Sequence, residues 1–259
     1  METLKALVAA CRDASGTVIE TTARSAPYTY GDFVPNVWKS GNLLGHYGVH
    51  PGGSVTVATG PKDAAAVETS RLADASDPLL AIIGATLVGA TVRLEPTEPV
   101  ESRALVLPAG WTERYELAPQ CTQIAYGGPP AAAEVVHFEQ EMWSENPIEP
   151  PERVAPEDPA LVDDETEYSH GDLLAVATAV VDEFDLGAES SIVLDAPVTE
   201  AGAVVPVLST LAAEATLELH QSGDGPADGE LIVGEGESEQ NGVVSAAELT
   251  RRLRDTRRA

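Results

Sequence analysis

The sequence predicts an α/β protein built from two similar three-layer α/β/α subdomains with mostly parallel sheets. Three observations support this fold class. Strand-like and helix-like segments alternate along the 259 residues, an order typical of parallel sheets with helices on both faces. The second half of the chain repeats motifs of the first, and a proline-rich segment lies between them. We therefore expect a subdomain at residues 1–145, an extended linker at 146–159 and a second subdomain at 160–259.

Hydrophobic periodicity predicts the elements of the first subdomain in order. Its first helix places Leu4, Leu7 and Val8 on one face. The predicted helices are residues 4–11, 31–47, 63–73, 78–88 and 132–142. The predicted strands are residues 17–21, 55–58, 91–94, 104–107 and 123–126.

The alternation resumes after the linker, whose five prolines and four acidic residues favour an extended chain. The predicted strands are residues 160–162, 191–194, 216–219 and 231–233. The predicted helices are residues 172–184, 201–213 and 245–257. We expect a kink at Pro206 within the second of these helices.

Two pairs of short motifs carry the internal repeat. Tyr-Thr-Tyr-Gly-Asp-Phe at 28–33 matches Tyr-Ser-His-Gly-Asp-Leu at 168–173. Gly-Ala-Thr-Val-Arg-Leu at 89–94 matches Glu-Ala-Thr-Leu-Glu-Leu at 214–219. Both copies predict a strand, a capped helix, a second strand, an apolar helix and a third strand.

The first motif pair also predicts how two helices begin. Thr29 precedes Asp32, and Ser169 precedes Asp172, by the three residues of a capping box. In such a box the hydroxyl accepts from a first-turn amide and the carboxylate accepts from the capping residue. We prefer this capping role for the segment that includes His170 over a catalytic one.

The charge of the chain is strongly negative and unevenly distributed. Forty-two acidic and 15 basic residues give a formal charge of -27, and Arg153 is the only basic residue between Tyr126 and Thr250. This charge excludes general binding to nucleic acid or to anionic membranes. At low salt such a charge repels itself and destabilises the compact state. At molar salt the Debye length falls to about 3 Å, which screens most of this repulsion. We therefore expect the protein of an extreme halophile. The alternative is an acidic mesophilic protein that binds a cationic partner.

Other features exclude further classes of protein. No apolar run reaches the roughly 18 residues of a transmembrane helix, and the first residues lack the apolar stretch of a signal peptide. Cys11 and Cys121 are too few for a disulfide framework. His46 and His50 are four residues apart, but Gly48 interrupts the helix that would align them on a metal. We expect a cytoplasmic protein with no metal site.

Several segments share motifs with one enzyme superfamily. Residues 29–55 are similar to its T-Y-x-E-L … G-V-x-x-G-D-x-V opening, and residues 79–96 to its A-x-L-G-x-x-x-A-G-A-x-x-V-P-L segment. Residues 169–174 and 195–219 are similar to elements that follow its phosphate loop. By these motifs, residues 26–219 resemble the adenylate-forming superfamily of acyl-CoA synthetases, luciferases and peptide-synthetase adenylation domains. The resemblance implies two similar α/β/α subdomains.

The parts of that family that carry chemistry are missing. The family holds ATP phosphates in a Thr/Ser/Gly-rich loop that ends in lysine, whereas residues 163–167 here are Asp-Asp-Glu-Thr-Glu. Residues 198–200, Val-Thr-Glu, replace the family's aromatic and histidine residues. The Y-G-x-T-E and T-G-D motifs have no match, and the last lysine is Lys62, so the catalytic lysine of the C-terminal domain is also missing. We predict no catalytic residues and no cofactor.

A remaining ligand pocket is expected where the resemblance and the strand ends place it. The residues predicted to line this pocket are Tyr126, Gly127, Gly128, His170, Asp195, Pro197 and Glu200. The arginines at the chain end are expected to complement the dipole of the last helix and to dock on the acidic body. They are Arg251, Arg252, Arg254, Arg257 and Arg258.

The expected function is therefore non-catalytic. We predict an acyl-CoA synthetase-like protein with a binding, scaffolding or regulatory role, whose partner is an intact acyl-CoA synthetase or another protein. Two alternatives stay open. One is an active or split acid–CoA ligase that uses ATP and a carboxylic acid, and the other is a protein that binds a small acyl or nucleoside ligand.

Overall fold

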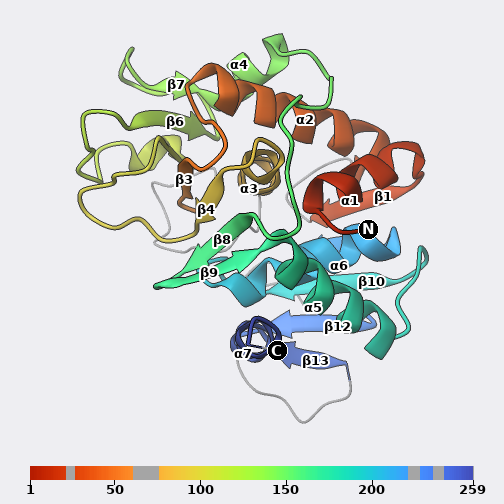
Figure 1. The fold of residues 1–259 in the computed structure, drawn as a ribbon. Helices are drawn as coiled ribbons and strands as arrows, with labels where there is room; N and C mark the ends of the chain where they lie inside the picture. The colour runs from red at the N-terminus through yellow and green to blue at the C-terminus, as the bar shows by residue number, and fades with distance from the viewer. Residues whose placement is uncertain (22–26, 61–75, 221–227, 236–241, 259) are drawn as a thin grey trace.

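The computed structural model describes residues 1–21, 27–60, 76–220, 228–235 and 242–258. These residues form two mostly parallel sheets covered by helices (Figure 1), which confirms the predicted α/β class. In spatial order, the six-stranded sheet consists of β13 (Val243–Ser245), β12 (Leu231–Gly234), β10 (Ser191–Asp195), β11 (Thr216–Leu219), β1 (Thr17–Thr21) and β2 (Tyr28–Thr29). The seven-stranded sheet consists of β7 (Val136–His137), β6 (Thr122–Tyr126), β5 (Ala104–Pro108), β3 (Ser54–Val57), β4 (Thr91–Arg93), β8 (Pro159–Asp163) and β9 (Thr166–Ser169).

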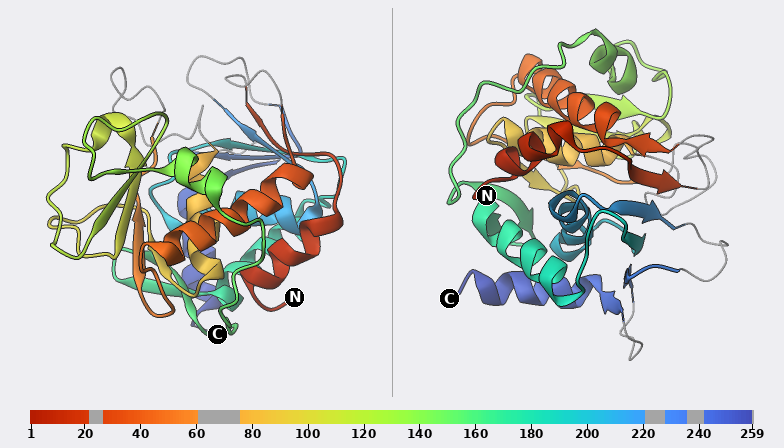
Figure 2. Two further views of the ribbon diagram at one scale, coloured as in Figure 1. Left: turned by 90° about the horizontal axis from the view of Figure 1, so that it is seen from above. Right: turned by 90° about the vertical axis from the view of Figure 1, so that its right-hand side faces the viewer.

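Helices pack in pairs over these sheets. The described α-helices are α1 (Leu4–Ala10), α2 (Tyr30–His46), α3 (Asp77–Leu87), α4 (Phe138–Ser144), α5 (His170–Glu183), α6 (Val205–Ala213) and α7 (Ala246–Thr256). Short 3-10 helices are η1 (Cys11–Asp13), η2 (Ala109–Trp111) and η3 (Ala201–Ala203). Helix α2 packs on α3, α5 packs on α6, and α7 packs on both α5 and η3. Both chain ends lie on the same side of the molecule (Figure 2).

The two halves of the chain exchange their hairpins. The antiparallel hairpin β1–β2 comes from the first half but lies in the six-stranded sheet, where Ile19 pairs with Leu217 of β11. The hairpin β8–β9 follows the linker but lies in the seven-stranded sheet, where Leu161 pairs with Val92 of β4. Each hairpin leads directly into a helix of its own half, α2 or α5. The sheets therefore divide the chain differently from the linker at 146–159.

The predicted capping residues begin both of these helices. Ser169 Oγ accepts from the Asp172 amide at 3.1 Å, and Asp172 Oδ2 accepts from the Ser169 amide at 2.9 Å. Thr29 Oγ1 likewise accepts from the Asp32 amide at 3.2 Å. The hydroxyls of Ser169 and Thr29 thus cap the two helices as predicted.

The structure corrects some predicted elements. The helix predicted at 132–142 is wrong in its first part, because Val136 pairs with Ile124 in a short strand and α4 begins only at Phe138. The helix predicted at 201–213 divides into η3 and α6, and Pro206 lies in the first turn of α6, where its missing amide costs no hydrogen bond. Strands β2, β9 and β13 were not predicted. The helix predicted at 63–73 lies outside the described residues.

The core is continuous between the halves. The residues at matching positions of the repeat, Tyr30 and His170, are both fully buried. The Tyr30 hydroxyl lies 2.8 Å from the carbonyl oxygen of Ala215 and so ties α2 to the end of α6. None of the helices in the described residues has the length and apolar character needed to span a membrane.

Candidate functional site

A cleft lies where strands of both sheets reach their carboxyl ends. Its larger lobe, of about 280 Å³, is lined by Ala58, Thr59, Leu94, Glu95, Pro96, Trp111, Tyr115 and Thr199. Its smaller lobe, of about 90 Å³, shares Leu94, Glu95 and Thr199 and adds Arg93, Thr97, Val162, Asp163 and Asp164. These residues follow or end β3, β4, β5, β8 and β10. We call this feature the strand-end cleft; open α/β sheets bind ligands at such an edge.

The acidic segment at 163–167 contributes Asp163 and Asp164 to one wall of the cleft. It is the tight turn of the hairpin β8–β9, in which Asp163 pairs with Thr166 and only Asp164 and Glu165 lie between the strands. Asp164 has a φ of 52°, in the left-handed region that aspartate tolerates better than most residues. The acidic residues 163–167 therefore form the end of β8, a two-residue turn and the start of β9.

The two aspartates of the turn have partners elsewhere in the chain. Asp163 Oδ2 accepts from the backbone amide of Ala201 at 3.1 Å, at the start of η3. Asp164 Oδ2 lies 3.8 Å from Arg254 Nη2 of α7. Arg252, also of α7, forms an ion pair with Glu183 of α5. Both arginines thus contact acidic residues of the body of the protein, as expected for the arginine cluster.

The glycine turn after β6 is held by packing and backbone contacts. Tyr126 is fully buried, and its hydroxyl accepts from the Gly60 amide at 2.9 Å. The Gly127 amide donates to Glu139 Oε1 at 2.6 Å. Gly127 and Gly128 have φ values of 87° and 134°, which L-residues rarely adopt. None of these three residues is among those that line the strand-end cleft.

His170 lies in the core, away from the cleft. Its Nδ1 atom accepts from the backbone amide of Leu4 at 3.3 Å, which ties α5 to the start of α1. Burial lowers the pKa of His170 to about 4, and the nearby charge of Asp158 opposes this shift only in part. The imidazole is therefore neutral and acts as a hydrogen-bond acceptor inside the protein.

The loop after β10 approaches the cleft, but its predicted residues have other contacts. Asp195 Oδ1 lies 3.4 Å from His220 Nδ1, at the adjacent carboxyl ends of β10 and β11. Glu200 Oε2 accepts from the Thr250 hydroxyl of α7 at 2.7 Å. Pro197 precedes Val198, whose carbonyl oxygen accepts from Thr59 at 3.1 Å. Thr199 is the residue of this loop that lines the cleft.

Sequence reasoning missed the cleft residues that follow β4 and β5. Glu95 follows β4, and Trp111 and Tyr115 lie on η2 and after it. The family-like segment at 79–96 includes Glu95 but does not mark it as a site residue, and no motif covers Trp111 or Tyr115. Their position after predicted strands could have indicated them, because the carboxyl ends of parallel strands gather at one edge. No group of three or more His, Cys, Asp or Glu side chains suited to a metal ion occurs within the described ranges.

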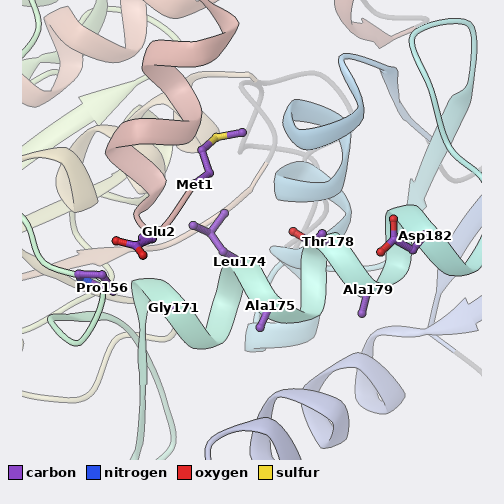
Figure 3. Close-up of a pocket in the computed structure, with 9 residues that line it drawn as sticks. All are labelled: Met1, Glu2, Pro156, Gly171, Leu174, Ala175, Thr178, Ala179 and Asp182. Atoms are coloured by element: carbon purple, nitrogen blue, oxygen red, sulfur yellow. The ribbon is translucent and has the colours of Figure 1, made fainter.

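A larger groove lies elsewhere, along the outer face of α5. It has a volume of about 530 Å³ and is lined by Met1, Glu2, Pro156, Gly171, Leu174, Ala175, Thr178, Ala179 and Asp182 (Figure 3). The labelled side chains are mostly small or apolar, with acidic residues at the two ends. It contains no convergent set of polar groups and lies away from the strand ends, so the smaller cleft is the better candidate site.

Comparisons with known proteins identify the class of fold. No protein-family model and no curated protein matches the sequence. Among solved structures, the chain is similar to the anthranilate CoA ligase AuaEII in complex with anthranoyl-AMP (TM-score 0.69, 16% identity), covering 84% of this chain and 45% of that one. The N-terminal domain of FACL13 from Mycobacterium tuberculosis is similar with a TM-score of 0.65 and 12% identity, covering 84% of this chain and 57% of that one.

A third similar structure is the long-chain-fatty-acid-CoA ligase FadD1 from Archaeoglobus fulgidus, with a TM-score of 0.64 and 16% identity. The similarity covers 83% of this chain and 46% of that one, so the chain spans about half the length of such enzymes. The chain has the fold of the N-terminal domain of adenylate-forming acyl-CoA ligases.

Proposed function

We propose that this chain is a non-catalytic relative of the acyl-CoA ligases, with a binding, scaffolding or regulatory role. The observation that carries the proposal is the hairpin β8–β9 with its carboxylates at 163–165 and 167. By the sequence resemblance, this hairpin stands where such ligases hold the phosphates of ATP.

The hairpin lacks each feature that a phosphate loop requires. Glycines let backbone amides approach phosphate oxygens, and a lysine supplies charge. The hairpin has neither residue, and its strands pair with each other along β8 and β9. At about 6 Å and an effective dielectric of about 20, each carboxylate–phosphate pair is repelled by roughly 3 kcal/mol. The turn therefore opposes a triphosphate.

The contact between Asp163 and Ala201 supports the same proposal. A free backbone amide at the start of a helical turn can donate to an anionic ligand. Here the Ala201 amide donates to the Asp163 carboxylate at 3.1 Å. The carboxylate satisfies this donor within the chain and adds negative charge next to it.

The proposed biological setting follows from the charge and the fold. We propose a cytoplasmic protein of a halophile that binds an intact acyl-CoA synthetase. The charge of -27 supports a salty cytosol, because screening relieves self-repulsion. A pull-down in molar KCl, with this chain as bait and the synthetase encoded nearest in the genome as prey, tests the partner. We expect the synthetase to be recovered when this chain is on the resin and not when it is absent.

Pyrophosphate release from ATP tests the absence of catalysis. The full chain is incubated in molar KCl with ATP, Mg²⁺, CoA and a panel of carboxylic acids, and an intact acyl-CoA ligase serves as the positive control. We expect no release above the protein-free rate. Clear turnover with any acid would show that the chain is an enzyme.

A split ligase is a second candidate function. The chain spans 45% of AuaEII and 46% of FadD1, which is the size expected of one subunit that supplies part of a ligase. This candidate predicts pyrophosphate release only when a second protein is added. The same assay with purified genomic neighbours therefore separates a split enzyme from a non-catalytic chain.

A small-ligand binding protein is a third candidate, favoured by the strand-end cleft. The cleft retains a volume of about 280 Å³ in its larger lobe. Thermal unfolding at high salt with AMP, an acyl-AMP analogue and CoA tests this candidate. A raised unfolding temperature with one of them supports it, and no shift with any of them counts against an acyl or nucleoside ligand.

A further inference from the structure

We infer that the strand-end cleft binds a small organic cation that carries an apolar body and a hydrogen-bond acceptor. This inference rests on the proposed binding function and names the chemical class of its ligand. Three properties of the described lining residues lead to it: their charge, their aromatic side chains and a buried donor without a partner.

The charge of the lining is the first property. The charged residues that line the two lobes are Glu95, Asp163, Asp164 and Arg93. Glu95 belongs to both lobes, and no hydrogen bond or ion pair holds it within the described part of the chain. Asp163 already accepts from the Ala201 amide and Asp164 pairs with Arg254, so Glu95 is the lining carboxylate that is available to a ligand. Its charge favours a cationic ligand over a phosphate or carboxylate. The charge of -27 on the whole chain adds to this preference by raising the local cation concentration.

The aromatic wall of the larger lobe is the second property. Trp111 and Tyr115 line this lobe beside Glu95. The Trp111 ring already attracts one cation, because the guanidinium carbon of Arg114 lies 4.4 Å from its centroid. Burial raises the pKa of Tyr115, Arg114 opposes this shift, and Glu98 and Glu95 add to it. An ammonium group between Glu95 and an aromatic face would gain both a charge pair and a cation–π contact.

The indole donor of Trp111 is the third property. Trp111 is only 4% exposed, and its Nε1 atom is buried with no hydrogen-bond partner among the residues that the structure describes. Buried donors in folded proteins nearly always have a partner. An acceptor oxygen on the ligand would satisfy this donor after a movement of the Trp111 side chain that exposes Nε1, which is buried in the structure.

Two probes with similar skeletons and opposite charges test the inference. Tyramine carries an ammonium group, a phenyl ring and an oxygen, and 4-hydroxyphenylacetate replaces the ammonium arm with a carboxylate. Each is titrated calorimetrically into the full chain at the lowest KCl concentration that keeps it folded. We expect heat of binding with tyramine and none with 4-hydroxyphenylacetate or AMP.

Two charge-matched variants locate the binding site. Glu95→Gln removes the shared carboxylate of the cleft, and we expect it to weaken tyramine binding about fivefold, as for a partly exposed ion pair. Glu189→Gln removes an exposed carboxylate after α5 and should leave tyramine binding unchanged. Both substitutions are at exposed positions, and matching thermal unfolding would show that both variants fold.

The outcomes separate this inference from the proposed function. Binding of 4-hydroxyphenylacetate as tight as that of tyramine, no binding of tyramine, or equal weakening by both variants would overturn the inference. Binding of AMP or 4-hydroxyphenylacetate alone would overturn it while leaving a non-catalytic binding protein. Pyrophosphate release in the ATP assay would instead overturn the proposed function.

Discussion

Asp163 and Ala201 join the two sheets of the protein at the edge where strands of both sheets reach their carboxyl ends. The Asp163 carboxylate, at the end of β8 in the seven-stranded sheet, accepts from the Ala201 amide after β10 of the six-stranded sheet. The two residues are 38 positions apart in the sequence. Their contact lies beside the strand-end cleft, which Asp163 also lines. The acidic segment at which the sequence departs from the superfamily that it resembles thus supplies a structural link in this chain.

Replacing this carboxylate should cost stability. Asp163→Ala leaves the Ala201 amide without its acceptor, and we expect a loss of about 1–3 kcal/mol in the free energy of unfolding. Urea unfolding followed by circular dichroism measures it. Asp164→Asn is the control, because the Asp164 side chain is 82% exposed and its ion pair is worth less than about 1 kcal/mol. Equal effects of the two substitutions would contradict the structural role of Asp163.

Gly202 should not tolerate a side chain. A Cβ atom at this position would collide with the backbone carbonyl oxygen of Ala246, because α7 packs directly on η3. We expect Gly202→Ala to destabilise the protein by about 3 kcal/mol through overpacking. Gly45→Ala is the control, since a Cβ there meets nothing within 4 Å and alanine favours helix α2 by up to about 1 kcal/mol. A neutral Gly202→Ala variant would argue against this packing of α7.

His170 should make stability depend on pH below neutrality. Burial lowers its pKa from 6.5 to about 4 in the folded protein, so the unfolded chain binds the proton first as pH falls. Stability is then complete above about pH 6.5 and decreases towards pH 4, by on the order of 2–3 kcal/mol. Urea unfolding across this range measures the slope.

Two variants isolate the contribution of His170. His170→Gln cannot take up this proton and should flatten the pH dependence of stability between pH 6.5 and 4. His50→Gln replaces an exposed histidine and should leave the slope unchanged. A slope that His170→Gln does not alter would place the titration elsewhere, for example in the carboxylates.

Salt should stabilise the folded chain. The formal charge of -27 repels itself in the compact state, and the Debye length shortens from about 30 Å at 0.01 M to about 3 Å at 1 M ionic strength. We expect the unfolding temperature to rise as KCl increases from millimolar to molar concentration. Scanning calorimetry measures this temperature, and a decrease over the same range would contradict a halophilic protein.

Much of the fold could be predicted from local patterns. The strand at 17–21 has the predicted bounds, and α2, α3, α5 and α7 begin and end within two residues of theirs. The capping boxes located two helix starts because they depend on residues three positions apart. Strand β9 was not predicted because it follows a run of acidic residues and itself contains Glu167, and acidic residues are depleted in strands. Leu161 nevertheless pairs with Tyr168 across the hairpin.

The exchange of hairpins and the position of the cleft could not be predicted in this way. Periodicity indicates that a segment is a strand but does not specify its partner, so nothing in residues 17–21 points to Leu217. The candidate residues Asp195, Pro197 and Glu200 were chosen by similarity. They lie at the end of β10 and in the loop after it, and Thr199 is the residue of this loop that lines the cleft. Trp111 and Glu95 come from different loops, and only the packed sheets bring them together.

The crossed placement of β1–β2 and β8–β9 has a consequence for the integrity of the chain. Ile148 is 64% accessible, and a single proteolytic cut near it would divide the chain between the two hairpins. Each fragment would then still have its hairpin paired at the edge of the sheet formed mainly by the other fragment. The two pieces should co-elute on size exclusion under native conditions, melt together in one transition and separate only in denaturant. Neither piece expressed alone would contain all the strands of one sheet. We therefore expect the two halves to fold only together.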